Sequence, residues 1–398
     1  TGASDDDPSG IATYSQAGAG FGLATLWTAW ITFPLMAGIQ EMCARIGMVT
    51  SKGLTNIIKT HYSKTLLYAM LVISFPAITL NIGADIAGMG AVSNLLIPSI
   101  PPFAFSIFFT SLLIIIIIRY PYKKLAAILK WLCIVLFLYV IVPFIVTKDW
   151  TVILKNTFFP TIQYNRNFLE ILVAILGTTI SPYLFFWQAN MEAENQAHLE
   201  RNIIIDKSFM KKMQSDVISG MFFSNIVMFF IILTTGVVLY TAGIRKIDTV
   251  DQAAQALRPL AGDLSYLLFA IGVIGTGLLA IPVLAGSLSY ILSETFNWKE
   301  GLDKKFHEAK GFYITLIISL LVGLFINLTR ITPFQALFFT AIVYGITAPV
   351  MIAIILHICN NKKIMGDQTN GLLSNFLGIV TLIIMAAAAV SLIYMQFT

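Results

Sequence analysis

The chain has 398 residues, of which 57% are hydrophobic and only 11% are charged. A soluble protein carries about 25% charged residues, so the composition excludes a soluble globular protein and predicts a polytopic helical membrane protein. The net charge of +5 does not indicate nucleic-acid binding, because the Lys and Arg residues fall in loops between apolar segments. Cys43, Cys133 and Cys359 form no CxxC pair, so the sequence indicates neither a disulfide framework nor a zinc site.

Apolar stretches long enough to span a bilayer, about 20 residues each, recur along the whole chain. Because the chain starts at Thr1 without a polar lead-in, we expect the first helix to be present only as its second half, and no cleavable signal peptide is visible. The sequence predicts eleven helices with approximate bounds 8–20, 22–46, 65–94, 102–119, 125–147, 168 onward with an interruption at 181–182, 215–241, 263–293, 311–328, 333–357 and 371–397.

Lys and Arg are unevenly distributed between alternate loops, which predicts the orientation in the membrane. If the first helix leads out of the cytoplasm, 18 of the 25 Lys and Arg lie on the cytoplasmic side. The other seven are Lys148, Lys155, Arg166, Arg245, Lys246, Arg258 and Arg330. We therefore expect a multi-pass protein of a prokaryotic inner (plasma) membrane, with the N-terminus in the cytoplasm and the C-terminus outside.

Three consecutive carboxylates, Asp5, Asp6 and Asp7, stand at the start of this apolar chain and are followed by Pro8 and Gly10. Charge inside a membrane segment is costly and usually functional. Proline and glycine together interrupt a helix. Transporters build cation sites where a membrane helix is broken, because the unwound backbone leaves carbonyl oxygens free to bind an ion. The segment therefore predicts a cation site.

The sixth predicted helix contains a second interruption, in which Gly177 and Pro182 enclose Thr178, Thr179 and Ser181. The two breaks are five helices apart, and breaks at corresponding positions of two halves point to a binding site at the membrane midplane. For Pro182 alone, a proline kink without a ligand is the simpler interpretation. The pair of breaks favours a binding site.

These segments resemble the Nramp (natural resistance-associated macrophage protein) family of divalent metal ion transporters. Asp7-Pro8-Ser9-Gly10 is similar to the Asp-Pro-Gly-Asn motif of the family, and Ser181-Pro182-Tyr183 lies where the family has Met-Pro-His. The segment 41–50 resembles the end of the family's second helix.

The resemblance implies an all-α polytopic membrane protein with a LeuT-like fold: two inverted five-helix repeats, with discontinuous helices 1 and 6, and an eleventh helix. The repeats are expected at 1–147 and 166–358, separated by an external loop at 148–165 and followed by the extra helix at 359–398. The resemblance also implies a transporter and not an enzyme. Its substrate would be divalent metal ions and its surroundings a lipid bilayer, with no cofactor, no nucleic acid and no obligate protein partner.

The chain departs from the family pattern at several positions. Gly10 replaces the asparagine, Ser181 the methionine and Tyr183 the histidine. In the third helix the proton-relay pair falls on Asp85 and Gly88, so the aspartate is retained and the glutamate is absent. The ninth helix contains no arginine. The chain therefore resembles a divergent branch of the family that is similar to the Nramp-related magnesium transporters.

These substitutions predict a changed ion preference. Replacing a thioether with the Ser181 hydroxyl weakens selection for iron or manganese over magnesium or calcium, and Mg²⁺ binds through few carboxylates while it keeps several waters. Tyr183 titrates near ~10 when unperturbed, so it cannot carry protons at neutral pH. We expect transport of a divalent cation, with Mg²⁺ or Mn²⁺ favoured and weak or no proton coupling. The expected metal-site residues are Asp7, Ser181, Thr178, Ser4 and Gly10, and those of the access path or polar network are Asp6, Asp85, Tyr183 and Asn81.

Three alternatives remain open. Within the family, the chain could be a broad-range proton-coupled importer of transition metals such as Mn²⁺ and Fe²⁺. A sodium-coupled amino acid transporter of the same fold would have to bind a substrate carboxylate, which three aspartates oppose. A membrane prenyltransferase would need a second aspartate-rich motif for its Mg²⁺–diphosphate site, and the chain has no second run of adjacent aspartates.

Overall fold

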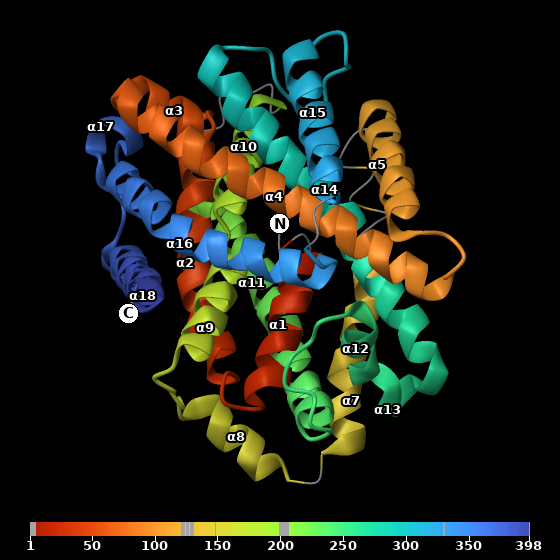
Figure 1. The fold of residues 1–398 in the computed structure, drawn as a ribbon. Coiled ribbons are helices and arrows are strands. Elements are labelled where there is room, and N and C mark those ends of the chain that lie inside the picture. Colours follow the sequence, from red (N-terminus) through yellow and green to blue (C-terminus); the bar gives the residue numbers. More distant parts are fainter. Residues whose placement is uncertain are drawn as a thin grey trace.

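The computed structural model describes residues 5–397, apart from 121–123, 125–126, 128–130, 148, 199–206 and 329–330. Within these ranges helices are the only regular elements (Figure 1). The main ones are α1 (Pro8–Phe21), α2 (Trp27–Thr50), α4 (Lys64–Leu96), α5 (Pro102–Arg119), η2 with α7 (Leu132–Phe137 and Leu138–Val146), α9 (Arg166–Thr179), α10 (Pro182–His198), α11 with η3 (Lys207–Thr235 and Gly236–Tyr240), α14 (Ser265–Phe296), α15 (Lys310–Ile326), α16 (Pro333–Asn360) and α18 (Leu372–Phe397).

Each of the eleven predicted spans coincides with one of these helices or helix pairs, although the first part of the fifth span lies outside the described residues. Among the described residues, seven helical segments are long and apolar enough to cross a membrane, and two further apolar helical segments are shorter. The sequence did not predict the short helices α3 (Leu54–His61), α8 (Trp150–Phe158), α12 (Val250–Ala254), α13 (Arg258–Ala261) and α17 (Lys362–Met365), because all are too short to span a bilayer.

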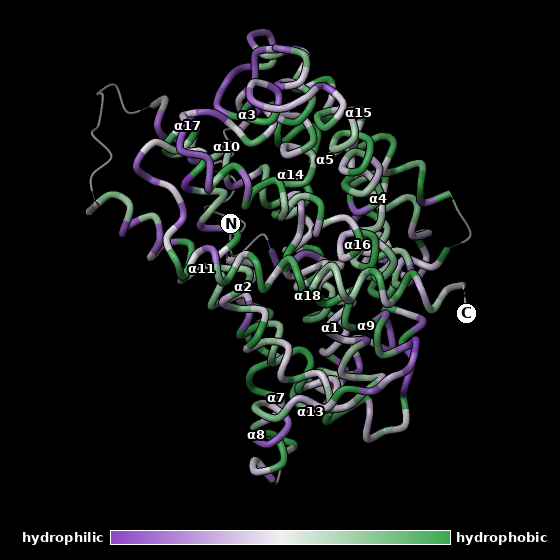
Figure 2. The backbone as a smooth tube through the Cα atoms, turned by 90° about the vertical axis from the view of Figure 1, so that its left-hand side faces the viewer, coloured by the Kyte–Doolittle hydropathy of each residue, from purple (hydrophilic) through white to green (hydrophobic). Residues whose placement is uncertain are grey.

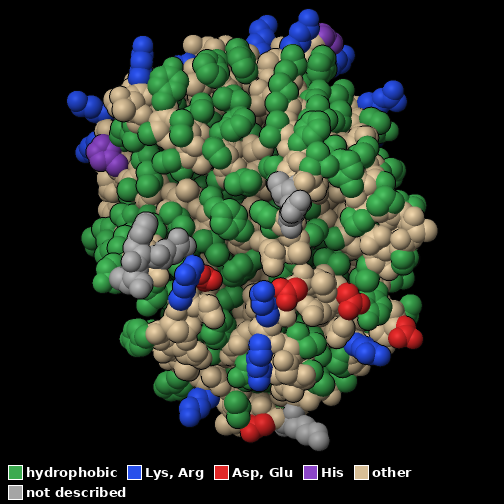
Figure 3. Space-filling model, in the orientation of Figure 1, with side chains coloured by type: hydrophobic (Ala, Val, Ile, Leu, Met, Phe, Trp, Pro, Cys, Tyr) green, Lys and Arg blue, Asp and Glu red, His purple; other side chains and the backbone are tan. Residues whose placement is uncertain are grey.

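Hydrophobic residues are concentrated in the middle of the molecule. Most residues there are hydrophobic, and hydrophilic residues gather toward the end of the molecule that carries α3 (Figure 2). On the face shown in Figure 3, hydrophobic side chains cover most of the surface, Lys, Arg and His line the upper rim, and further charged residues lie toward the α8 end. This pattern is that of a protein surrounded by lipid with its loops in water.

Two groups of helices pack around the interior of the molecule. In one group α4 contacts α5, α14 and α15, and α14 also contacts α15. In the other, α11 contacts α1 and α2, and α2 contacts α10. Asp5, Asp6 and Asp7 are all buried, so the segment that carries them is in the interior.

Glycines allow several of these helices to touch backbone to backbone. A Cβ atom at Gly177 of α9 would collide with the Ala341 carbonyl of α16, and one at Gly18 of α1 would collide with the Ile232 carbonyl of α11. Gly47 of α2 meets the Ala189 carbonyl of α10 in the same way. Only glycine lets the backbones approach this closely, as is common between membrane helices.

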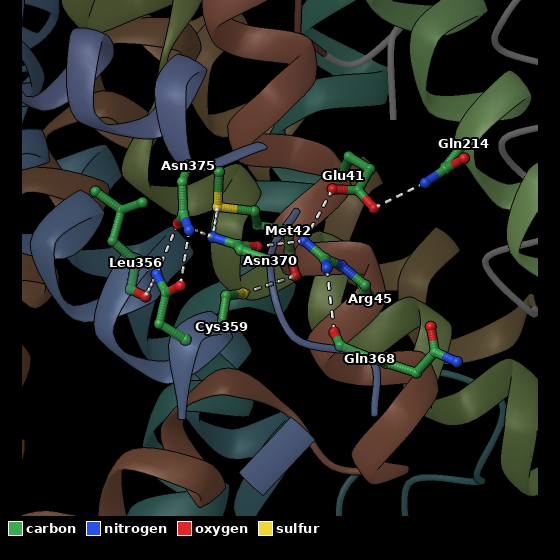
Figure 4. Close-up of polar contacts among 10 residues, drawn as sticks. Glu41, Met42, Arg45, Gln214, Leu356, Cys359, Gln368, Asn370 and Asn375 are labelled. Atoms are coloured by element: carbon green, nitrogen blue, oxygen red, sulfur yellow. Dashed lines mark hydrogen bonds and ion pairs between the residues drawn. The ribbon is translucent and has the colours of Figure 1, made fainter. Parts of the chain in front are cut away.

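A polar network joins α2 to the segment that precedes α18 (Figure 4). Arg45 Nη2 lies 3.2 Å from Glu41 Oε2, and Arg45 Nη1 donates to the Gln368 carbonyl at 3.1 Å. Arg45 also donates to the Asn370 side chain, and Gln214 of α11 donates to Glu41 Oε1 at 3.2 Å. The buried ion pair is thus supported by further hydrogen bonds, as a buried charge pair requires.

Candidate cation-binding site

Asp7 stands at the first break, where α1 begins. The helix starts with Pro8, which is favourable at the first helical position because it lacks an N–H. Asp7 is the N-cap: its Oδ1 accepts hydrogen bonds from the Gly10 N–H and the Ser9 hydroxyl, both at 2.7 Å. The residue is only 1% exposed. The sequence therefore places a carboxylate in the interior at the N-terminal end of a helix, where the helix dipole favours negative charge.

Two other helices hold the second oxygen of this carboxylate. Asn81 Nδ2 of α4 donates to Asp7 Oδ2 at 2.8 Å, and Thr340 Oγ1 of α16 donates to Asn81 Oδ1 at 3.0 Å. Thr340 and Asn81 are both buried. The hydrogen bonds give Asp7 one orientation, fixed from α1, α4 and α16 together.

The second break faces the first. The helix α9 ends at Thr179 and α10 begins at Pro182. Thr178 Oγ1 lies 3.5 Å from Ser9 Oγ, so hydroxyl groups from the two breaks meet. A Cβ atom at Gly10 would lie 3.4 Å from Thr178 Oγ1 and 3.5 Å from Asp7 Oδ1, which places Gly10 between these residues.

Ser181 lies between α9 and α10 and is buried. Its hydroxyl donates to the carbonyls of Gly177 at 3.0 Å and Thr178 at 2.6 Å. The hydroxyl hydrogen is therefore directed at the backbone, and the lone pairs of Ser181 Oγ are left for another partner. The hydroxyl thereby satisfies carbonyls that the interrupted helix cannot.

Three more aspartates are buried near Asp7. Neither carboxylate oxygen of Asp85 on α4 has a hydrogen-bond partner within the described residues. Asp5 and Asp6 contact Ser224 of α11. No ion pair among the described residues involves any of the four aspartates. Carboxylates are rarely buried without a countercharge, and those that are usually have a function.

Two positions at which this chain departs from the family pattern, Gly88 and Tyr183, have apolar or aromatic neighbours. A Cβ atom at Gly88 would lie 3.1 Å from Leu337 Cδ1, so this face of α4 meets an apolar side chain of α16. Tyr183 of α10 is buried, and its ring centroid lies 5.8 Å from that of Tyr344 on α16. Tyr183 is therefore in the core beside the second break.

The structure thus brings Asp7, Asn81, Thr178 and Gly10 together, and the Ser181 hydroxyl contacts the Thr178 carbonyl between the two helices. Ser4 lies outside the described residues, so its expected role stays a prediction. The sequence analysis missed Ser9, although it is inside the motif, and it missed Thr340 and Ser224. Thr340 has the same helical spacing as Tyr344 and Thr347, so it was detectable as part of one polar face of α16. Ser224 had no detectable signal.

The donor set limits how an ion could be held. No group of three or more His, Cys, Asp or Glu side chains in the described part of the chain is arranged to hold a metal ion. A cation at Asp7 would therefore combine one carboxylate with hydroxyl, amide or carbonyl oxygens and retained water, as hard divalent ions do.

Two broken helices that meet at a buried carboxylate, inside a bundle with apolar spans, define a membrane transporter of the LeuT-like class. The chain belongs to the Nramp family: residues 1–395 match the family described as "Natural resistance-associated macrophage protein-like". The family prediction made from the two motifs is therefore confirmed. Membership of this transporter family also confirms that the chain is not an enzyme.

Relatives and solved structures agree with this assignment. The "Divalent metal cation transporter MntH" of Caldanaerobacter subterraneus subsp. tengcongensis is 22% identical over 381 residues, covering 94% of this chain and 86% of the relative. The protein of the same name from Bacillus subtilis is 22% identical over 370 residues, covering 92% and 83%.

A mutant of the Eremococcus coleocola manganese transporter superposes with a TM-score of 0.77 at 16% identity, covering 97% of this chain and 83% of that chain. Mhp1, a nucleobase-cation-symport-1 family transporter, superposes with a TM-score of 0.57 at 12% identity, covering 99% and 90%. These matches confirm the predicted fold class. The repeat boundaries expected from the sequence stay a prediction.

Proposed function

We propose that this chain carries divalent metal cations across a bacterial inner membrane by alternating access, with Mg²⁺ or Mn²⁺ favoured and with weak or no proton coupling. The observation that carries the proposal is the buried Asp7 carboxylate at the first helix break, directly across from Thr178 at the second. The relatives named above are described as divalent metal or manganese transporters, which supports the same class of substrate.

The atoms around Asp7 favour a hard cation. Ser9 and Thr178 contribute hydroxyl oxygens beside Asp7, and Ser181 contributes one at the second break. None of these hydroxyls offers the soft character of a thioether. Mn²⁺ accepts such oxygen ligands, and Mg²⁺ prefers them. A site with one fixed carboxylate and several neutral oxygens supports a partly hydrated ion.

The surroundings of the relay positions support weak proton coupling. Gly88, where the family has a glutamate, faces Leu337, and Tyr183 replaces the histidine. Without a complete relay, transport follows the ion gradient and the membrane potential. At ~2.3 kcal/mol per charge per 100 mV, a divalent ion gains about 4.6 kcal/mol, which supports accumulation of roughly a thousandfold without protons.

Burial of the site supports alternating access, because an Asp7 that is 1% exposed is closed to water on both sides. The orientation follows the distribution of Lys and Arg: the loops expected in the cytoplasm carry α3 and α17, and those expected outside carry α8 and α13 (Figure 1). We therefore place the α3 end on the cytoplasmic side.

Transport by purified protein in liposomes tests the proposal, with Mg²⁺, Mn²⁺ and Ca²⁺ supplied in turn and a pH probe inside. We expect uptake of Mg²⁺ and Mn²⁺ driven by an inside-negative potential without acidification of the lumen. Asp7→Asn should abolish uptake, whereas Asp149→Asn, at an exposed cap of α8, should leave it intact. Ser181→Met should favour Mn²⁺ over Mg²⁺, because a thioether selects softer ions.

Each of the other outcomes overturns a stated part of the proposal. Unchanged uptake by Asp7→Asn would refute the site. Acidification of the lumen in step with Mn²⁺ uptake would support the proton-coupled importer of transition metals instead. Sodium-dependent uptake from an amino acid mixture, without uptake of divalent ions, would refute the substrate class.

A further inference from the structure

Asp5 and Asp6 face a different helix from Asp7. Ser224 Oγ of α11 donates to Asp5 Oδ2 at 2.5 Å and lies 3.2 Å from Asp6 Oδ1, whereas Asp7 is bound by Asn81 of α4. Asp5 is 0% exposed and Asp6 is 5% exposed. The unwound segment therefore presents one carboxylate toward α4 and two toward α11.

The described side chains around Asp5 and Asp6 supply few hydrogen bonds to the two carboxylates. Ser224 has one hydroxyl hydrogen for two carboxylates, and Asp5 Oδ1 has no hydrogen-bond partner within the described residues. No ion pair in the described part of the chain involves either residue. An isolated buried carboxylate costs several kcal/mol unless a proton or a cation neutralises it. Asp5 Oδ1 therefore has a lone pair available to a cation.

We propose that Asp5, Asp6 and Ser224 form a second site for a hard divalent cation, separate from the one at Asp7. Two carboxylates and a hydroxyl are oxygen ligands of the kind that such ions prefer, and their charge of −2 matches one divalent ion. When the ion binds, the Ser224 hydrogen turns away and its oxygen faces the ion. The class of cation rests on the proposed function, whereas the location of the site rests on the contacts of Ser224.

The total charge supports two ions. Asp5, Asp6, Asp7 and Asp85 together carry −4 when ionised, so one divalent ion at Asp7 leaves half of this charge unbalanced. Two ions balance it. Adjacent sites also promote release, because the repulsion between neighbouring ions weakens the binding of each. The second site therefore acts as a position from which an entering ion speeds release of the ion at Asp7.

The number of bound ions tests this inference directly. Purified protein in detergent is titrated with Mn²⁺ at pH 7 and pH 8.5, and free Mn²⁺ is measured by electron paramagnetic resonance. We expect two Mn²⁺ per chain. Asp7→Asn should retain one, Asp6→Asn should retain the other, and the double variant should bind none. Ser224→Ala, the milder change, should weaken the second ion at least tenfold.

Ser289→Ala is the matched control, because the buried Ser289 hydroxyl donates to the Ala285 carbonyl of its own helix. It should bind two ions with native affinity. Size-exclusion profiles and melting temperatures show whether each variant is folded. If an aspartate variant does not fold, Ser224→Ala still tests the second site.

The possible failures are distinguishable. One ion in the native chain that Asp7→Asn removes and Asp6→Asn retains overturns the second site and leaves the proposed function standing; protons then neutralise Asp5 and Asp6. One ion that Asp6→Asn removes and Asp7→Asn retains supports the site at Ser224 and overturns the assignment of Asp7. No binding at either pH overturns both.

Discussion

Asn81→Ala is the sharpest test of how the transport site is held. Asn81 is the donor to Asp7 Oδ2 at 2.8 Å and accepts from Thr340 at 3.0 Å, so the substitution removes both contacts. The other carboxylate oxygen keeps its bonds to Ser9 and Gly10. Asp7 therefore stays at the break but loses the bond that fixes its rotation toward α4.

The size of the effect follows from the kind of bond that is lost. A hydrogen bond to a charged group contributes about 1.5–3 kcal/mol. If this free energy is lost entirely from ion binding, KM for Mn²⁺ or Mg²⁺ rises by roughly 10- to 150-fold. Because two bonds to Asp7 remain, we expect the lower part of this range.

Initial rates of Mn²⁺ uptake into liposomes give KM directly. The matched control is Asn327→Ala, because Asn327 also donates from its side chain to a neighbouring helix, to the Gly83 carbonyl at 3.3 Å, but does not contact Asp7. We expect the KM of this control to stay within twofold of the native value. If Asn81→Ala leaves KM unchanged in a protein that melts at the native temperature, Asn81 does not position the ligand.

Two further predictions concern stability. Gly177→Ala forces α9 away from the Ala341 carbonyl of α16 and should destabilise the protein by about 1–3 kcal/mol, seen as a lower melting temperature. Burial, followed by the charges of Glu294 and Glu194, raises the pKa of Glu300 to about 9. Because the folded pKa exceeds the unfolded value of about 4.3, the folded protein holds a proton that the unfolded chain has lost, and this residue lowers stability as pH rises from about 4.3 to about 9. The melting temperature of the native chain should therefore fall relative to that of Glu300→Gln between pH 5 and pH 9.

Controls separate these effects from general damage. Gly371 has open space where its Cβ would be added, so Gly371→Ala should melt at the native temperature. An equal loss in both glycine variants would contradict the packing argument. For Glu300, a melting difference that is constant across the pH range would show that its carboxyl does not titrate as described.

The long helices were predictable because bilayer thickness sets their length. The span 102–119 matches α5 to the residue, and 65–94 lies within two residues of α4. The breaks were predictable for a related reason, since Pro8 and Pro182 each begin a helix. In both cases the physical cause acts within one segment, so local sequence is enough.

The contacts across the site were much less predictable. The pattern placed Asn81 near the site, but its bonds to Asp7 and Thr340 depend on how α1, α4 and α16 cross, which no single segment determines. Ser224 is an ordinary serine within an apolar helix, and only the fold brings it to Asp5 and Asp6. The polarity of a site is thus visible in the sequence, whereas its partners depend on tertiary packing.

The hydrogen bond between Asp7 and Asn81 crosses the boundary between the two helix groups. On one side, glycines let α1 pack closely against α11 and α2 against α10. On the other side, α4 packs with α5, α14 and α15. If the two groups move as rigid bodies, the distance between Asp7 and Asn81 differs between the two arrangements. The positions of the oxygen atoms that could bind an ion then differ as well. Occupancy and motion are then thermodynamically linked: the preference of an ion for one arrangement over the other is the free energy with which it shifts the balance between them.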